Sequence, residues 1–175
     1  KYAVDLLRQV VSLNDGIYLE QELRDTQKTK FCIGVAGYPE KHFEAPNPAT
    51  DLQYLKEKVD AGADYIITQM FFDNAKFHAF VKDCRAIGIT VPIIPGLKPI
   101  YTKKQLTVLP KTFHIDLPTE LSNEVLRCKT DLDVEKVGKE WLLAQSKELK
   151  AAGVPVLHYY TLGRPQLVAD VVKDI

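Results

Sequence analysis

The sequence predicts an α/β fold in which parallel strands alternate with helices. Four short, continuously apolar runs are the first observation behind this prediction, because such runs are typical of strands buried on both faces. The second observation is that each run is followed by a segment whose apolar residues recur every three or four positions, the spacing of one helix face. This alternation predicts parallel pairing with right-handed crossovers.

Capping and stop residues bound the helices in the first half of the chain. Asn47 can cap a helix whose first position is Pro48, where the missing N–H costs nothing, and Gly62 closes that helix. The elements predicted in this half are, in order, a helix over 2–13 stopped by Asn14-Asp15-Gly16, a polar unassigned stretch over 17–30, a strand over 31–36 ending at Gly37, the helix from Pro48, a strand over 65–72, and a helix that Asp73 caps and Gly88 ends.

The second half continues the alternation with longer connections. Apolar residues such as Val134, Leu142 and Leu149 have the spacing of one inward face of a long helix, and Gly153 is its predicted C-terminal stop. The elements predicted here are, in order, a strand and turn over 91–96, a short helix capped by Thr102 and running through Leu109, helices over 118–126 and 131–152, a strand over 156–160, and a final helix from about Pro165.

Two architectures fit these four strand-helix units. A doubly wound open sheet fits a chain of 175 residues, but the glycine motifs of dinucleotide-binding and P-loop proteins do not occur. A (β/α)8 TIM barrel needs about 250 residues, so this chain would supply only half of one. The helical start and Lys1 in place of Met favour the barrel, with 1–175 as a single partial domain that lacks its N-terminal strands.

Composition excludes several classes of protein. The 23 Lys and Arg residues balance 23 Asp and Glu residues, so no net basic charge attracts nucleic acid. No apolar stretch approaches the about 18 residues of a membrane span, and the start does not resemble a signal peptide. We therefore expect a cytoplasmic protein that binds neither nucleic acid nor membranes. Cys32, Cys84 and Cys128 are far apart in sequence and are expected to be small buried hydrophobic residues.

In both architectures the active site lies at the carboxyl ends of the strands. The residues there are mainly aromatics, an amide, an imidazole and a guanidinium, which suit a large planar ligand, and no spacing indicates a metal site. They are Tyr38, Pro39, Glu40 and His42 after the first strand, Gln69 on the second, Pro95 and Gly96 after the third, and Tyr160 and Arg164 after the fourth.

Each of these residues also has a structural interpretation. Gln69 could be a core amide that hydrogen-bonds to backbone, while Glu40 and His42 could be ordinary exposed side chains. Asp51 and Lys58 fall on one polar stripe of the helix from Pro48, together with Tyr54, and could be a solvated helix face.

Five segments, taken together, point to one family. They are Gly37-Tyr38-Pro39-Glu40-Lys41-His42-Phe43-Glu44-Ala45, Asp51 followed by Leu55-Lys56-Glu57-Lys58-Val59-Asp60-Ala61-Gly62-Ala63, Ile67-Thr68-Gln69-Met70-Phe71-Phe72-Asp73, Pro95-Gly96, and His158-Tyr159-Tyr160-Thr161-Leu162-Gly163-Arg164. In this order, and over most of the chain from about Phe31 onward, the sequence resembles methylenetetrahydrofolate reductase.

The resemblance implies a flavin enzyme on a (β/α)8 barrel, with this chain as its last four β/α units. It implies reduction of 5,10-methylenetetrahydrofolate to 5-methyltetrahydrofolate by NADH or NADPH through FAD, in one-carbon and methionine metabolism, by a homo-oligomer. The positions that match FAD contacts are Tyr38, His42, Ala45, Asp51, Tyr54, Glu57 and Lys58. Those that match or adjoin substrate contacts are Gln69, Gln105, Tyr160 and Arg164.

No catalytic residue is assigned, because the general acid of the family is a glutamate on the first barrel strand, outside this chain. We therefore expect this segment alone to be inactive. One alternative is a non-catalytic half-barrel binding module that associates with a partner chain. Another is a phosphate-binding lyase or aldolase, which the lack of a strand lysine and of a glycine-rich loop after the last strand disfavours.

Overall fold

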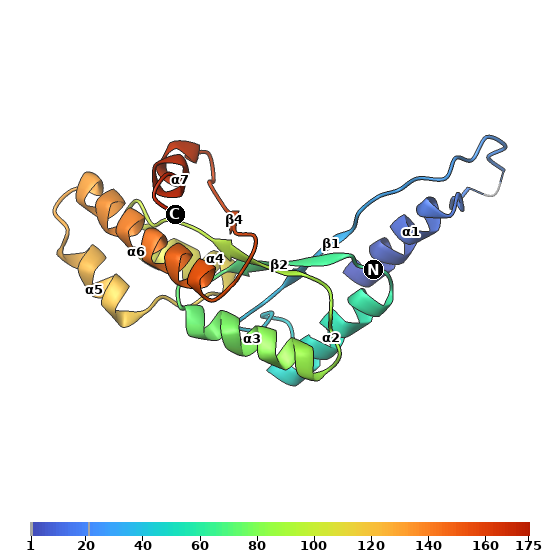
Figure 1. Ribbon diagram of the computed structural model, residues 1–175, viewed down its shortest axis with the longest axis horizontal. Helices are drawn as coiled ribbons and strands as arrows, with labels where there is room; N and C mark the ends of the chain where they lie inside the picture. Colours follow the sequence, from blue (N-terminus) through green and yellow to red (C-terminus); the bar gives the residue numbers. More distant parts are fainter. Residues whose placement is uncertain (1, 21) are drawn as a thin grey trace.

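A parallel sheet of four strands, in the order β1-β2-β3-β4, runs through the computed structural model, which describes residues 2–20 and 22–175 (Figure 1). The strands are β1 (Gly34–Gly37), β2 (Tyr65–Met70), β3 (Ile93–Leu97) and β4 (His158–Tyr159). A doubly wound sheet reverses its strand order at a switch point, whereas a barrel adds strands in sequence. The consecutive order across the described strands therefore matches a portion of a barrel.

The helices follow the strands in the same consecutive manner. They are α1 (Ala3–Asn14), α2 (Pro48–Asp60), α3 (Asn74–Ala86), α4 (Gln105–Phe113), α5 (Thr119–Arg127), α6 (Asp131–Ala151) and α7 (Pro165–Val172). Helix α1 packs on α2, α2 on α3, α3 on α6 and α6 on α7, while α5 packs on α6. The predicted alternation of parallel strands and helices is confirmed.

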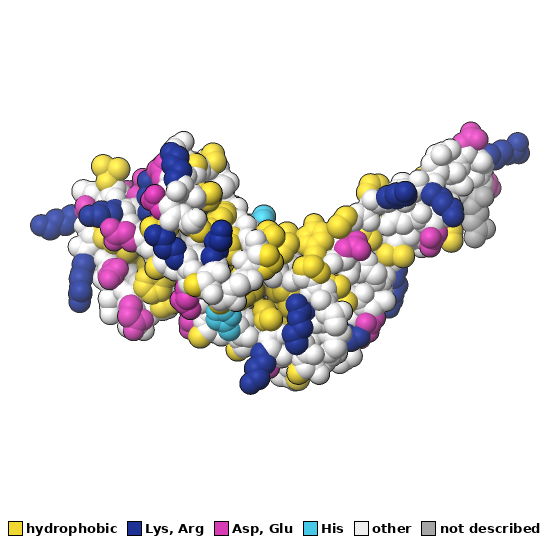
Figure 2. Space-filling model, viewed as in Figure 1, with side chains coloured by type: hydrophobic (Ala, Val, Ile, Leu, Met, Phe, Trp, Pro, Cys, Tyr) yellow, Lys and Arg dark blue, Asp and Glu magenta, His cyan; other side chains and the backbone are white. Residues whose placement is uncertain are grey.

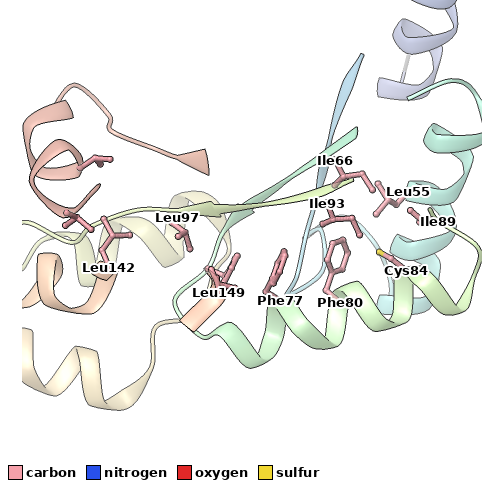
Figure 3. Close-up of a cluster of buried hydrophobic side chains, with 13 residues drawn as sticks. Leu55, Ile66, Phe77, Phe80, Cys84, Ile89, Ile93, Leu97, Leu142 and Leu149 are labelled. Atoms are coloured by element: carbon pink, nitrogen blue, oxygen red, sulfur yellow. The ribbon is translucent and has the colours of Figure 1, made fainter. Parts of the chain in front are cut away.

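The main core lies between the sheet and its helices. Figure 3 shows Phe77 and Phe80 of α3 pointing toward the sheet, where Ile66 and Ile93 lie. Leu55 of α2 belongs to the same cluster. A second cluster, which includes Met70, Ile100 and Val134, lies among α4, α5 and α6. Each large apolar side chain buried in this way stabilises the fold by about 1.5–3 kcal/mol.

Burial of the strands on both faces was the wrong expectation. Side chains on β2 alternate, because Ile66 is fully buried while Tyr65 and Ile67 are only half-buried. The helices cover one face, and among the described residues nothing comparable covers the other. Figure 2 shows hydrophobic side chains gathered in the hollow between the lobe of α4 to α7 and the arm that carries α1. Phe31 and Cys32 are exposed and precede the strand, which begins only at Gly34.

Other boundaries differ from the sequence prediction for local reasons. Thr102 is not a helix cap: its carbonyl accepts from the Gln105 N–H in a preceding turn, and no side chain caps α4. The helix continues past Pro110 to Phe113, one turn beyond the predicted end, so the proline lies inside it. Strands β2 and β4 are shorter than predicted. No helix in the described part of the chain is long and apolar enough to cross a membrane.

The three cysteines have three different environments. Cys84 is buried, as expected, and burial raises the pKa of its thiol to about 11. Cys128 is half-buried, and Cys32 is exposed, so the expected burial was wrong for Cys32. All three are free thiols.

Candidate functional site

The carboxyl ends of the four strands lie along one edge of the sheet, and a polar or aromatic residue lies at or directly after each of them. Tyr38 directly follows β1, Gln69 lies near the end of β2, Lys98 directly follows β3 and Tyr160 directly follows β4. Strand ends of this kind are where parallel α/β folds build their sites. We call this set of ends the carboxyl edge.

The polar stripe on α2 faces the carboxyl end of β1. Asp51 lies in the first turn, and its Oδ2 accepts a hydrogen bond from the His42 N–H at 2.9 Å. Lys58, two turns later, donates from Nζ to the Ala36 carbonyl at 2.9 Å. Both side chains are half-buried rather than solvated. Tyr54 and Glu57, which belong to the same predicted set, are exposed.

Opposite charges share this small region. Burial lowers the pKa of Lys58, and the nearby Asp51 carboxylate partly opposes that shift. Burial also raises the pKa of Tyr38, with smaller contributions from Asp51 and Glu44. A partly desolvated ammonium and carboxylate interact more strongly with a polar ligand than exposed groups do, because the local dielectric constant is lower.

The loop after β1 is held by its own lysine. Lys41 adopts φ 93°, and its Nζ donates to the carbonyls of His42 at 2.9 Å, Phe43 at 3.4 Å and Ala45 at 2.6 Å. These three contacts compensate a backbone conformation that costs a non-glycine residue about 1–3 kcal/mol. The His42 ring contacts Tyr38 edge-on with centroids 4.6 Å apart, and Ala45 is buried.

Glu40 is not an exposed side chain, contrary to one of its sequence interpretations. Its side chain is 9% exposed, and Oε1 accepts from Lys76 Nζ at 2.6 Å. Its Oε2 accepts from the Asp116 N–H at 2.9 Å. Glu40 therefore joins the loop after β1 to α3 and to the segment before α5, and both of its oxygens are already engaged.

Gln69 combines the two interpretations that the sequence left open. Its Oε1 accepts from the Met70 N–H at 2.9 Å, which is the backbone contact expected of a core amide. Its Nε2 has no hydrogen-bond partner among the described residues, and Gln69 lines a small pocket with Tyr38, Lys41 and His114. The amide nitrogen is thus free to donate to a ligand.

Tyr160 is fixed against β2 by its hydroxyl, in a region where the backbones of β2 and β3 approach closely. Its hydroxyl donates to the Thr68 carbonyl at 2.9 Å, and the Thr68 hydroxyl accepts from the Gly96 N–H at 2.9 Å. A Cβ at Gly96 would lie 2.2 Å from the Thr68 carbonyl oxygen and 2.6 Å from the Tyr160 ring. Glycine therefore lets the Tyr160 ring pack at the end of β3. Burial raises the pKa of Tyr160, and Tyr38 adds to that shift.

Gln105 and Arg164 both contact Tyr101, a residue that sequence reasoning missed. The Tyr101 N–H donates to Gln105 Oε1 at 2.8 Å. The Arg164 guanidinium carbon lies 4.9 Å from the centre of the Tyr101 ring, and Arg164 also pairs with Glu135 of α6. No motif or spacing in the sequence signals Tyr101.

Lys98 is a second residue that the sequence analysis missed. It is 1% exposed, and its Nζ donates to the Pro99 carbonyl at 2.9 Å and lies 4.4 Å from the centre of the Tyr101 ring. Burial lowers the pKa of Lys98 to about 8. A charged residue that directly follows an apolar strand was the available signal.

The structure groups the predicted residues unevenly. Tyr38, His42, Ala45, Asp51 and Lys58 surround the loop after β1, while Gln105 and Arg164 share Tyr101. Tyr54 and Glu57 have no hydrogen bond to the other predicted residues in the described part of the chain. Across residues 2–20 and 22–175, no group of three or more His, Cys, Asp or Glu side chains could hold a metal ion.

Comparison with known proteins gives consistent matches. The family model described as methylenetetrahydrofolate reductase matches residues 1–175. A probable methylenetetrahydrofolate reductase (NADPH) of Caenorhabditis elegans is 36% identical over 97% of this chain, and methylenetetrahydrofolate reductase (NADH) 1 of Arabidopsis thaliana is 41% identical over 90% of it. The chain spans 28% of the length of each of these relatives.

One solved structure supports the fold. It is an uncharacterized protein from Clostridium thermocellum that binds two copies of 5-methyl-5,6,7,8-tetrahydrofolic acid. The likeness has a TM-score of 0.53 at 21% identity and covers 79% of this chain and 50% of that one.

Proposed function

The chain belongs to the methylenetetrahydrofolate reductase family, and we propose that it is part of an enzyme that reduces 5,10-methylenetetrahydrofolate to 5-methyltetrahydrofolate with NADH or NADPH. The chain is then one partial domain, residues 1–175, that supplies the last four β/α units of a (β/α)8 barrel. The complete enzyme is a cytoplasmic homo-oligomer. This assignment of function rests on the family match across the whole chain.

The residues beside the loop after β1 fit FAD. A flavin nucleotide presents a flat ring system, a polyol and a pyrophosphate, so it needs aromatic contacts, backbone amides and a cation. Tyr38 and His42 supply rings, and the half-buried Lys58 ammonium supplies positive charge close to the Asp51 carboxylate. The residues that would hold FAD are Tyr38, His42, Ala45, Asp51, Tyr54, Glu57 and Lys58.

Bound FAD would supply the two-electron redox chemistry that connects the reduced nicotinamide to the folate. The protein's own residues then need only to bind and orient flat rings. Gln69 keeps a free amide N–H at the carboxyl edge, and the Tyr160 hydroxyl is fixed nearby by its bond to the Thr68 carbonyl. We propose Gln69, Gln105, Tyr160 and Arg164 as the substrate-binding residues of this chain.

Glu40 does not take the role of general acid in this proposal. Both of its oxygens already accept hydrogen bonds, one from the Lys76 ammonium and one from the Asp116 N–H, so neither is left for a substrate. In this proposal the general acid is the glutamate that the family carries on the first barrel strand, outside residues 1–175.

The observation that supports the proposed site most directly is the pair of contacts from α2 to β1. Asp51 and Lys58 lie seven residues apart; Lys58 contacts the Ala36 carbonyl in β1, and Asp51 contacts the His42 N–H in the loop after β1. An ordinary solvated stripe would leave both side chains free in water. Their half-buried charges are thus fixed where a ligand of the carboxyl edge would meet them.

The test of the proposed function uses the complete protein. We expect purified protein to show flavin absorbance near stoichiometry after incubation with FAD. NADH or NADPH should bleach that absorbance without oxygen, and 5,10-methylenetetrahydrofolate should then restore it. Protein that binds no FAD contradicts the proposal. Protein that binds FAD but is not reoxidised by the folate supports the non-catalytic binding module instead.

A further inference from the structure

Two cations lie over one aromatic ring at the carboxyl edge. The Lys98 ammonium is 4.4 Å and the Arg164 guanidinium carbon 4.9 Å from the centre of the Tyr101 ring. Both distances are within the about 6 Å range in which a ring face attracts a cation. The ring therefore links the segment after β3, which carries Lys98, to the segment after β4, which carries Arg164.

The backbone of Tyr101 holds a second predicted substrate residue. Its N–H donates to Gln105 Oε1 at 2.8 Å, and the Gln105 side chain is 8% exposed. That bond engages the amide oxygen of Gln105 within the protein and leaves its amide nitrogen for a ligand. Tyr101 thus contacts both Gln105 and Arg164, which belong to different strand-helix units.

Arg164 depends on this ring more than its other contacts suggest. Its side chain is half-exposed, and among the described residues its one ion pair is with Glu135 on α6. An exposed ion pair by itself fixes a long side chain poorly, because two flexible chains must be ordered for a small gain. A planar guanidinium that also rests on an aromatic ring is restrained in two directions.

We propose that Tyr101 is a positioning residue for the folate substrate, whose ring sets the guanidinium of Arg164 and whose backbone N–H sets the amide of Gln105. This inference rests on the proposed function. The phenol hydroxyl plays no part in it, since the ring face and the backbone N–H make the contacts. Lys98 completes the arrangement by holding the ring from its buried position.

The test compares Tyr101→Leu with Tyr101→Phe in the complete enzyme. The leucine variant keeps the backbone N–H and apolar volume but lacks the ring, so we expect KM for 5,10-methylenetetrahydrofolate to rise about tenfold. We expect kcat and the rate of flavin reduction by NAD(P)H, measured without folate, to change by less than about twofold. Tyr101→Phe keeps the ring, so its KM should stay within about twofold of the wild-type value.

A double variant shows whether Tyr101 acts through Arg164. If it does, adding Tyr101→Leu to Arg164→Gln should raise KM by less than about twofold beyond Arg164→Gln alone. Effects that multiply would show that Tyr101 acts independently and would overturn the proposal. Loss of the ring leaves the Lys98 ammonium buried with one acceptor, so the same comparison is made in a Lys98→Met background if Tyr101→Leu does not fold.

The outcomes separate this inference from the proposed function. Wild-type protein that fails to turn over the folate contradicts both. Active wild-type protein with an unchanged KM in Tyr101→Leu contradicts the role of Tyr101 alone. A KM that rises equally in Tyr101→Phe also overturns it, because the ring is present in that variant.

Discussion

Lys98 shows how one buried charge can shape a site. Its ammonium lies below the surface with the Pro99 carbonyl and the Tyr101 ring as its contacts, and no carboxylate pairs with it among the described residues. Burial of a cation without a counter-ion favours the neutral amine, which is why the pKa of Lys98 falls to about 8. The ring face offsets only part of that cost.

The stability of the complete protein should therefore depend on pH through Lys98. In the unfolded chain lysine has its ordinary pKa of 10.5, whereas in the fold the pKa is about 8. Between these values the unfolded state binds the extra proton, so this residue makes wild-type stability rise as pH increases from about 8 to 10.5. Lys98→Met should be more stable than wild type at pH 7, by at most about 3 kcal/mol, and the difference should shrink toward pH 10.5.

Thermal unfolding of both proteins across this pH range measures the difference. Lys150→Met, which replaces an exposed lysine of α6, is the matched control and should follow wild type at every pH. A Lys98→Met protein that is less stable than wild type at pH 7 would show that the charge is stabilised in the fold, contrary to the predicted direction.

At the scale of elements, the contact between β2, β3 and β4 depends on Gly96. Its backbone does not have a positive φ, so glycine is required there by space rather than by conformation. A Cβ would meet the Thr68 carbonyl oxygen at 2.2 Å, and backbone atoms of adjacent strands cannot move apart without breaking the ladder. The Tyr160 hydroxyl bond to the same carbonyl would be lost with it.

Gly96→Ala should lower the stability of the complete protein by about 3 kcal/mol or more, because overpacking at a backbone contact forces the strands apart. The control is Gly153→Ala. Gly153 has φ +83° and nothing within 4 Å of a Cβ, so alanine there should cost only the backbone strain, about 1 kcal/mol. Apparent Tm values compare the two. Equal losses of Tm in the two variants would contradict the prediction, because the close contact at Gly96 would then add nothing to the loss of stability.

The sequence predicted elements well where spacing and caps act locally. Asn47 caps α2 through Thr50, and Asp73 caps α3 through Ala75, because an Asx side chain at such a position bonds to a nearby N–H. The predicted end of α4 at Leu109 was too early, because packing of Leu109 and Phe113 in the second core cluster carries the helix through Pro110, a residue that usually ends one.

At the scale of the whole molecule, the sheet presents one covered and one open face. Continuous apolar runs predict burial on both faces, yet Tyr65, Ile67 and Ile94 remain half-buried. The prediction that these apolar runs form strands was therefore right, and the prediction that both faces of the sheet are buried was wrong for the described residues. A barrel that encloses this face would bury those side chains, which is the arrangement that we propose for the complete enzyme.

Contacts between distant segments set the limit of what the sequence could predict about the site. The spacing of Asp51 and Lys58 along one helix is visible in the sequence, and their half-buried positions fit the predicted role. Glu40 with Asp116, and Tyr101 with Arg164, are pairs far apart in the chain. No local pattern encodes such pairs, because they arise only when the strand ends meet.

The affinity of the complete protein for FAD is the measurement that tests the proposed site most directly. Lys58→Met removes the half-buried ammonium beside Asp51, whereas Lys56→Met removes a lysine of the same helix that pairs with Asp60 instead. Lys58→Met should weaken FAD binding about tenfold or more, as measured by flavin fluorescence, and Lys56→Met should match wild type within about twofold. Equal FAD affinity in all three proteins would contradict the assignment of the cofactor to this face of α2.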